Sequence, residues 1–246
     1  MQKKKLGIVL SGGGAKGAYE VGFLKALSEF GIQPHAVSGA SIGALNGAIY
    51  AALGDTTKSA LILEKLWNDL AHTDTLKLDT EKVIKNIVDV LTYFSPMPVS
   101  RLTKVVMTAM KAGKSQEGLL SQIPMIDRLK QYACVEELKK GLPFYVGMTK
   151  SHGNLQDVAN YFELGKEEVV FKKIQNLKDE EIHKAIMASA ALPILFDGLE
   201  IEGEIYRDGC LGSTENQWGN TPAKPLVTDE KCTHLIVCHL GNGSFF

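Results

Sequence analysis

The chain has 246 residues, of which 45% are hydrophobic and 22% are charged, and its formal net charge is −1. This composition excludes a disordered or low-complexity protein and predicts a globular chain with a sizeable core. The near-zero charge argues against nucleic acid as a bulk electrostatic partner.

The first quarter of the chain predicts alternating strands and helices. The apolar run over residues 6–10 follows a short basic segment and is too short for a signal peptide, so a buried strand is expected over 7–11. A helix is expected over 15–30, a second strand over 32–38, and a helix of small residues over 42–53 that ends at Gly54. Strands and helices at this spacing are typical of a parallel sheet with right-handed crossovers.

The middle of the chain is predicted to be helical. Apolar residues recur at helical spacing over 57–70, 81–94, 99–112 and 125–140. We interpret residues 77–140 as a helical insertion within a single domain that spans 1–246. The segment 93–99, which contains two prolines, is a candidate lid or membrane-contacting loop. The alternative is an ordinary connection between helices whose Phe94 and Met97 belong to the core.

The last hundred residues predict a second group of strands. Strands are expected over 144–149, over 155–164 after a turn at 152–154, over about 200–208, and over 235–240, where the strand is buried. A helix is expected over 179–191, ending before Pro193. The elements together predict an α/β fold, a three-layer sandwich with a mainly parallel central sheet flanked by helices.

Four glycines within six positions, 12–17, follow the first strand and leave the backbone uncovered. Gly12, Gly14 and Gly17 satisfy the dinucleotide motif G-x-G-x-x-G, but the second strand ends in "HAVSGAS", without the acidic residue that would hold a ribose. A nucleotide P-loop fails because Ala18 follows Gly17. The third candidate is an oxyanion hole built from backbone amides at a helix N-terminus. Lys16 fits this use, because a cation in the first helical turn opposes the macrodipole and contributes little to the fold. The alternative is that the Lys16 side chain simply points into water.

A candidate nucleophile lies in the next loop. Residues 39–43, "GASIG", match G-x-S-x-G between a strand and a helix, a sharp turn that presents Ser41 while Gly39 and Gly43 avoid collisions. Neighbouring parallel strands end side by side, which would place the glycine-rich loop next to Ser41. The serine needs a base. The histidines lie in no recognisable motif, whereas Asp208, followed by Gly209, ends a predicted strand.

These motifs resemble the patatin-like phospholipase family. "SGGGAKG" is similar to its glycine-rich oxyanion segment, "GASIG" to its nucleophile elbow, and Asp208–Gly209 to its aspartate turn. Residues 185–196 and 220–222 are similar to two further stretches of the family. The chain departs from the family pattern at Cys210, where a glycine is frequent, and in a longer segment over 211–219.

The resemblance implies a Ser-Asp dyad hydrolase without histidine and without a cofactor, acting on lipid acyl esters as a phospholipase A or lysophospholipase. Ser41 would be the nucleophile and Asp208 the general base, with Gly209 supporting its turn. The oxyanion hole would be formed by Gly12, Gly13, Gly14 and Lys16.

Two other function classes remain open. One is a nucleotide- or anion-binding α/β domain that uses only the glycine loop, and the other is a family member that binds lipid without turnover. A metal site is not expected, because Cys232, His234 and Cys238 share one side of a predicted strand but lack a fourth ligand. The four cysteines form no C-x-x-C pair and predict a cytoplasmic protein. Its expected partner is a lipid or acyl-ester substrate, with peripheral membrane contact and the oligomeric state left open.

Overall fold

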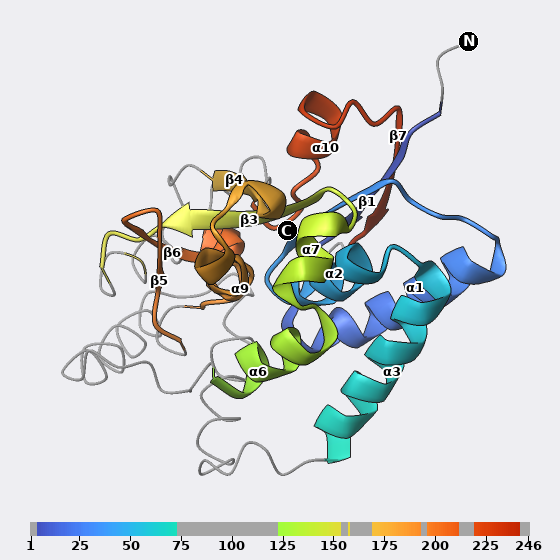
Figure 1. Cartoon of the computed structure of the whole chain (residues 1–246), viewed down its shortest axis with the longest axis horizontal. Helices are drawn as coiled ribbons and strands as arrows, with labels where there is room; N and C mark the ends of the chain where they lie inside the picture. The colour runs from blue at the N-terminus through green and yellow to red at the C-terminus, as the bar shows by residue number, and fades with distance from the viewer. Residues whose placement is uncertain are drawn as a thin grey trace, which may run out of the picture.

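The structure, a computed structural model, describes residues 4–72, 123–153, 157, 169–192, 196–211 and 219–241. Within these residues seven strands form one sheet, in which hydrogen-bonded neighbours follow the order β5-β6-β3-β2-β1-β7 and β4 also pairs with β3 (Figure 1). The strands are β1 (Leu6–Leu10), β2 (Ala36–Ala40), β3 (Phe144–Lys150), β4 (Val169–Lys173), β5 (Leu199–Ile201), β6 (Glu204–Asp208) and β7 (His234–Cys238).

The sheet is parallel in one half and antiparallel in the other. β1 pairs in parallel with β2 and with β7, and β2 pairs in parallel with β3. β4 and β6 both run antiparallel to β3, and β5 runs antiparallel to β6. Both turn residues between β5 and β6, Glu202 and Gly203, have positive φ, as the two-residue turn of a tight hairpin requires. The parallel strands are therefore those linked by helices, and the added strands make the sheet mixed.

The helices agree with the sequence pattern where their ends are marked by turn residues. Gly54 adopts the left-handed conformation that ends α2. The helix expected over 125–140 is two helices, because the chain becomes extended at Cys134 before the second one starts. The helices are α1 (Ala18–Glu29), α2 (Ile42–Leu53), α3 (Thr56–His72), α6 (Ile123–Tyr132), α7 (Val135–Lys140), α9 (Asp179–Ala188) and α10 (Lys224–Thr228), with 3₁₀ turns η1 (Gly14–Gly17), η2 (Ile174–Asn176) and η3 (Gly209–Leu211).

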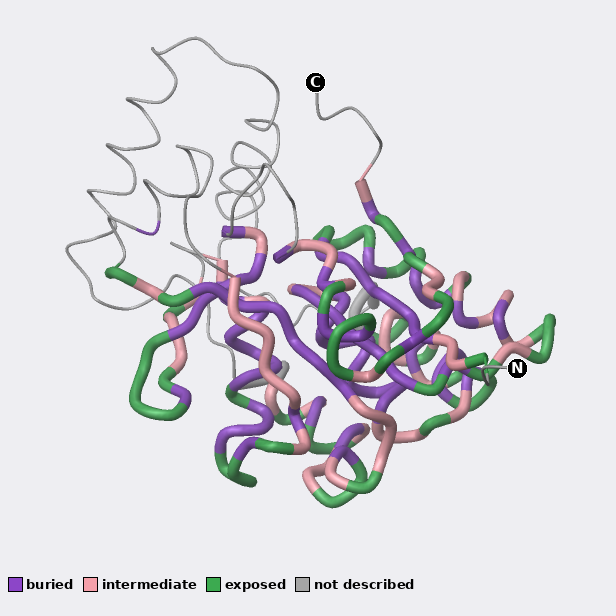
Figure 2. The backbone as a smooth tube through the Cα atoms, turned by 90° about the horizontal axis from the view of Figure 1, so that it is seen from above, coloured by how far each residue is buried: buried purple, intermediate pink, exposed green. Residues whose placement is uncertain are grey.

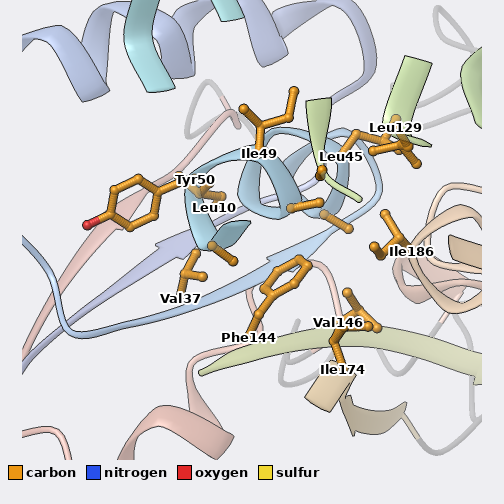
Figure 3. Packing of buried hydrophobic residues seen from close by; sticks show 14 of the residues in the cluster. Leu10, Val37, Leu45, Ile49, Tyr50, Leu129, Phe144, Val146, Ile174 and Ile186 are labelled. Atoms are coloured by element: carbon orange, nitrogen blue, oxygen red, sulfur yellow. The ribbon is translucent and has the colours of Figure 1, made fainter. Parts of the chain in front are cut away.

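The helices cover the two faces of the sheet unequally. Alternate residues of the strands, such as Leu10, Val37 and Phe144, face the larger core, where Figure 3 shows them against Leu45 and Ile49 of α2. The intervening residues face a smaller cluster closed by Leu226 of α10. Of the described helices, α1, α2, α3, α6, α7 and α9 contribute to the larger core, and Figure 1 shows α10 on the opposite side of the strands. Buried backbone runs through the middle of the molecule in Figure 2, where the central strands lie.

Two strand predictions need correction. The last strand is not fully buried: β7 is an edge strand among the described residues, and Val237 is 44% exposed because only β1 pairs with it. Beside β3 the structure places β4, over Val169–Lys173, which the sequence pattern did not reveal because its residues are all half-buried and show no alternation. Of the strand expected over 155–164, only Asp157 is described, in a helical conformation.

The predicted insertion is described only in part. Its helices α6 and α7 pack against α2 and α9, so this portion belongs to the main core. The helices expected over 81–94 and 99–112, and the segment 93–99 with Phe94 and Met97, lie outside the described residues. No helix in the described ranges is long and apolar enough to cross a membrane.

Candidate active site

Two strands meet end to end beside β3. β4 occupies one edge of β3 from Tyr145 to Thr149, so β2 and β6 must share the opposite edge. β2 runs parallel to β3 and its Ala40 pairs with Gly147, whereas β6 runs antiparallel and its Asp208 pairs with the next residue, Met148. The two strands therefore point at each other. Ser41, the residue after Ala40, and Asp208 are brought to the same step of the sheet.

Ser41 sits in a strained turn that the backbone holds on both sides. Its φ is 52° and its ψ is −126°, a conformation that costs a non-glycine residue about 1–3 kcal/mol. Its amide donates to the Ser189 carbonyl at 3.0 Å and to the Ser189 hydroxyl at 3.1 Å, and its carbonyl accepts from the Ala44 amide at 2.9 Å. Ser189 in turn donates to the Gly147 carbonyl at 2.6 Å. Hydrogen bonds from α9 and α2 thus maintain a conformation that presents the Ser41 side chain.

At the two predicted elbow glycines, and at Gly209 after Asp208, the structure has no room for a side chain larger than a hydrogen atom. A Cβ on Gly39 would lie 2.3 Å from the Gly43 carbonyl oxygen, and a Cβ on Gly43 would lie 2.3 Å from the Leu10 carbonyl oxygen. A Cβ on Gly209 would lie 2.7 Å from the Gly147 carbonyl oxygen. In each case the obstacle is backbone, which moves less readily than a side chain, so the first turn of α2 lies directly on the end of β1.

Asp208 is buried completely, and its environment tunes the carboxylate. One oxygen, Oδ1, accepts a hydrogen bond from the Cys210 amide at 2.9 Å, whereas Oδ2 has no partner in conventional hydrogen-bond geometry among the described residues. Burial raises the pKa of Asp208 to about 6, and interactions with the Cys210 amide and the Ser41 hydroxyl oppose that rise. The carboxylate is therefore ionised at neutral pH, with one oxygen uncommitted and the Ser41 hydroxyl nearby.

The Cys210 side chain is a feature that the sequence marked as a departure. Burial, together with the adjacent Asp208 carboxylate, raises the pKa of the Cys210 thiol well above its ordinary value. The thiol therefore stays protonated at neutral pH and adds no second negative charge beside Asp208. Its backbone amide serves the carboxylate as any residue type would, so the departure leaves the amide contact to Asp208 intact.

Some backbone amides of the glycine-rich loop donate hydrogen bonds within the fold, and others have no acceptor among the described residues. Gly12 donates to the Asn220 carbonyl at 3.0 Å, and a Cβ on Gly12 would lie 3.1 Å from Ser41 Cβ, which places the loop beside the serine. The amide of Lys16 donates to the Gly13 carbonyl at 3.2 Å. The amides of Gly13 and Gly14 have no acceptor in the described part of the chain, and both residues are exposed. Of the four residues predicted for an oxyanion hole, the structure leaves these two amides free. The exposed Lys16 can contribute only through its side chain.

Ser189 and Asn220 support the site but were not among the predicted site residues. Asn220 contacts Gly12 twice, through its carbonyl oxygen and through Nδ2, which donates to the Gly12 carbonyl at 3.4 Å. Both residues lie in stretches that resemble the family, at 185–196 and 220–222, and that resemblance was the available signal. Their roles are backbone contacts between distant segments, which a local motif does not specify.

Two described histidines make their hydrogen bonds to segments other than the Ser41 turn. His183 hydrogen-bonds through Nε2 to the Ala133 carbonyl at 2.8 Å, and His234 lies at the exposed start of β7 against Thr233. Within the described ranges no group of three or more His, Cys, Asp or Glu side chains could hold a metal ion. The titratable group that the structure does bring to Ser41 is Asp208.

Comparison with known proteins decides the family. The family model described as "Patatin-like phospholipase" matches residues 8–217. The chain belongs to the patatin-like phospholipase family. This confirms the expected family.

Similar proteins share a short stretch with this patatin-like chain. Lysophospholipase nte1 of Aspergillus terreus is 52% identical over 52 residues, which are 21% of this chain and 3% of that protein. Neuropathy target esterase sws of Drosophila melanogaster is 56% identical over 45 residues, 18% of this chain and 3% of that protein. Among solved structures, VipD from Legionella pneumophila has a TM-score of 0.42 at 18% identity, covering 85% of this chain and 46% of its own. The ExoU–SpcU complex of Pseudomonas aeruginosa gives 0.39 at 20% identity, with 77% and 36% covered.

Proposed function

We propose that this patatin-like chain hydrolyses acyl esters of lipids with Ser41 as nucleophile and Asp208 as general base. The observation that carries the proposal is the convergence of β2 and β6 on one step of β3, which brings a strained serine to a buried, ionised carboxylate. The amides of Gly13 and Gly14 would form the oxyanion hole, because they lie in the loop beside Ser41 and have no acceptor in the described residues.

The chemistry follows from these groups. Ser41 Oγ attacks the ester carbonyl while Asp208 accepts its proton, and the carbonyl oxygen gains negative charge facing the two amides. The leaving alcohol takes the proton from Asp208, and an acyl group remains on Ser41. A water molecule then gives a proton to Asp208 and attacks the acyl-enzyme, and Asp208 passes that proton to Ser41 Oγ as the bond to the acyl group breaks, which releases the fatty acid and restores both residues.

The electrostatics suit this sequence of steps. A base with a pKa of about 6 accepts a proton more readily than an ordinary aspartate and is still ionised at pH 7. Each oxyanion donor typically contributes about 3 kcal/mol of transition-state stabilisation. The lysophospholipase name of several relatives supports a phospholipase A or lysophospholipase substrate class, and such a lipid would bring the enzyme to a membrane surface.

Activity-based labelling tests the proposal. A fluorophosphonate should modify Ser41, as shown by peptide mapping, and Ser41→Ala should abolish both labelling and hydrolysis of a short-chain ester. Ser38→Ala is the matched control, because Ser38 is a buried serine on the same strand, and it should be labelled like wild type.

The pH dependence of labelling tests the base. The rate should fall about tenfold per pH unit below about pH 6, as Asp208 becomes protonated. Modification of a residue other than Ser41, or turnover by Ser41→Ala, would contradict the assignment. A folded wild type that binds lipid vesicles but is neither labelled nor active would favour lipid binding without turnover.

A further inference from the structure

A buried polar network lies under the glycine-rich loop and takes no part in the chemistry described above. Asn46 is at its centre, on α2 and 2% exposed. Its Nδ2 donates to the Gly17 carbonyl at 3.0 Å and to Glu20 Oε2 at 2.8 Å, and its Oδ1 accepts from Trp67 Nε1 at 3.2 Å. One side chain therefore links the last residue of the loop turn, helix α1 and helix α3.

The same network holds the end of the glycine-rich loop against the start of α2, next to Ser41. A Cβ on Gly17 would lie 2.3 Å from Ile42 Cγ1 and 3.0 Å from Trp67 Cζ2, so the end of the loop rests on the residue that follows Ser41. The bond from Asn46 to the Gly17 carbonyl holds the loop in this contact. Because α2 starts directly after Ser41, Asn46 and the nucleophile move as parts of one helix.

We propose that Asn46, oriented by Glu20 and Trp67, is a positioning residue that sets the free amides of the glycine-rich loop against Ser41, and that Glu20 works in its protonated form. The inference rests on the proposed function, because it assigns the loop amides to an oxyanion. An error of about 1 Å in such a placement can cost about a hundredfold in rate.

The surroundings of Glu20 explain why its protonation matters. Glu20 is buried completely and its Oε1 has no partner among the described residues. Burial raises its pKa to about 8, and the Asn46 hydrogen bond opposes the rise. The titratable group of β7 that faces it, the Cys238 thiol, has a pKa raised to about 12 by burial and is neutral. Asn46 and Trp67, from α2 and α3, are uncharged, and Lys16 in the preceding turn is exposed.

Ionisation of Glu20 would act against the reaction in two ways. A carboxylate under the loop would repel the oxyanion that the loop amides stabilise, with little solvent to screen it. It would also draw the Asn46 amide towards itself and weaken the bond to the Gly17 carbonyl. The rate should therefore decline as the pH rises past about 8, in addition to the decline below about 6 caused by Asp208.

The first test is the pH profile of Glu20→Gln. Glutamine keeps the shape and an acceptor for Asn46 but cannot ionise, so kcat/KM for a soluble short-chain ester should lose its alkaline decline and keep its acid decline. Glu181→Gln is the matched control, since Glu181 is also a buried carboxyl with one unpartnered oxygen but lies on α9, and it should keep both limbs. An alkaline limb that persists unchanged in Glu20→Gln, or that wild type lacks up to about pH 10, overturns the role of Glu20.

The second test separates positioning from simple stability. Trp67→Phe keeps the ring and removes the donor to Asn46, and Asn46→Ala removes the whole link. We expect kcat to fall about threefold to tenfold in the first and about thirtyfold to a hundredfold in the second, with KM nearly unchanged. Tyr50→Phe is the control, because it removes a buried hydrogen bond from α2 to the Pro34 carbonyl and should leave kcat as it is.

The outcomes are distinguishable. Wild-type kcat in folded Asn46→Ala, or an equal loss in Tyr50→Phe, overturns the positioning role. If Asn46→Ala does not fold, Trp67→Phe decides the question: a wild-type kcat in this variant overturns the role, and a loss supports it. Failure of the proposed function would appear in a different experiment, as ester hydrolysis by Ser41→Ala. The result of that experiment does not depend on the Asn46, Trp67 and Glu20 variants.

Discussion

Two junctions between a strand and a helix lie side by side in this protein, and they differ in whether their backbone amides are hydrogen-bonded. After β1 the chain is exposed from Gly13 to Lys16, winds into a 3₁₀ turn and leaves the amides of Gly13 and Gly14 without acceptors in the described residues. After β2 the chain turns within one residue, and the Ser41 amide is already bonded to Ser189. The first junction leaves backbone amides exposed. At the second junction the backbone hydrogen bonds fix the turn, and the turn exposes the Ser41 side chain.

Under the proposed function, this difference gives two neighbouring strands of similar length two separate parts of one reaction. An oxyanion needs donors whose hydrogen bonds are not used in the fold, so the first loop has to be open. A nucleophile needs one orientation, so the second loop has to be held, and the price of that orientation is the strain at Ser41. Substitutions in the two loops and at Asp208 test this difference.

Asp208→Asn should remove the proposed general base. We expect kcat to fall by about a thousandfold or more, since a neutral amide cannot accept the serine proton. The fold should gain stability at pH 7. The raised pKa of Asp208 means that the unfolded chain loses its proton first, so wild-type stability falls as the pH rises from about 4 to about 6.

The asparagine variant escapes this loss, which amounts to roughly 2–3 kcal/mol. Urea unfolding at pH 7 and at about pH 4 checks the sign, because the gain should vanish at the lower pH. Undiminished turnover by the folded variant would contradict the role of Asp208.

Gly43→Ala should damage the elbow through packing alone. The new Cβ would meet the Leu10 carbonyl oxygen at 2.3 Å, and backbone must shift to relieve the contact, at a cost of about 3 kcal/mol. Gly22→Ala is the control, because no atom lies within 4 Å of its Cβ position in α1, and it should stabilise by about 1 kcal/mol. Thermal unfolding of the two variants measures the difference. Equal stabilities would show that the two backbones can separate.

Gly14→Ala should affect the open loop in a way that a matched glycine does not. Gly14 and Gly31 have φ of 58° and 64° with nothing near their Cβ positions, so alanine adds similar backbone strain of about 1–2 kcal/mol at each. Only Gly14 carries a free amide at the site, and its variant should lose about tenfold in kcat while Gly31→Ala keeps the wild-type value. A similar kcat in both variants would mean that the left-handed conformation of Gly14 is not needed for the reaction.

Ser41→Gly should relieve the strain that the elbow holds. Glycine accepts the positive φ of this position, so the free energy of unfolding should rise by about 1 kcal/mol while activity disappears. Ser41→Ala is the comparison, because it removes the hydroxyl and retains the strain. If the two variants unfold at the same denaturant concentration, the conformation of Ser41 is not costly.

Local sequence determined the features whose physics is local. The G-x-S-x-G turn and the Asp-Gly pair pointed to Ser41 and Asp208, which the structure brings to one step of β3. The glycine spacing pointed to the loop whose Gly12 lies beside Ser41. Helix α2 starts and stops where the pattern predicted, because a tight turn precedes it and the left-handed Gly54 follows it. These signals require only neighbouring residues, and they were sufficient to predict the family.

Tertiary structure decided which groups are available to a substrate. Gly12 and Gly13 look alike in the sequence, yet Asn220 occupies the amide of Gly12 and leaves that of Gly13 free. The meeting of Ser41 with Asp208 depends on an antiparallel strand beside β3, and the buried link through Asn46 depends on three helices that pack together. Such contacts join residues far apart in the chain. Their geometry is set by how the whole core packs, which no local pattern of residues records.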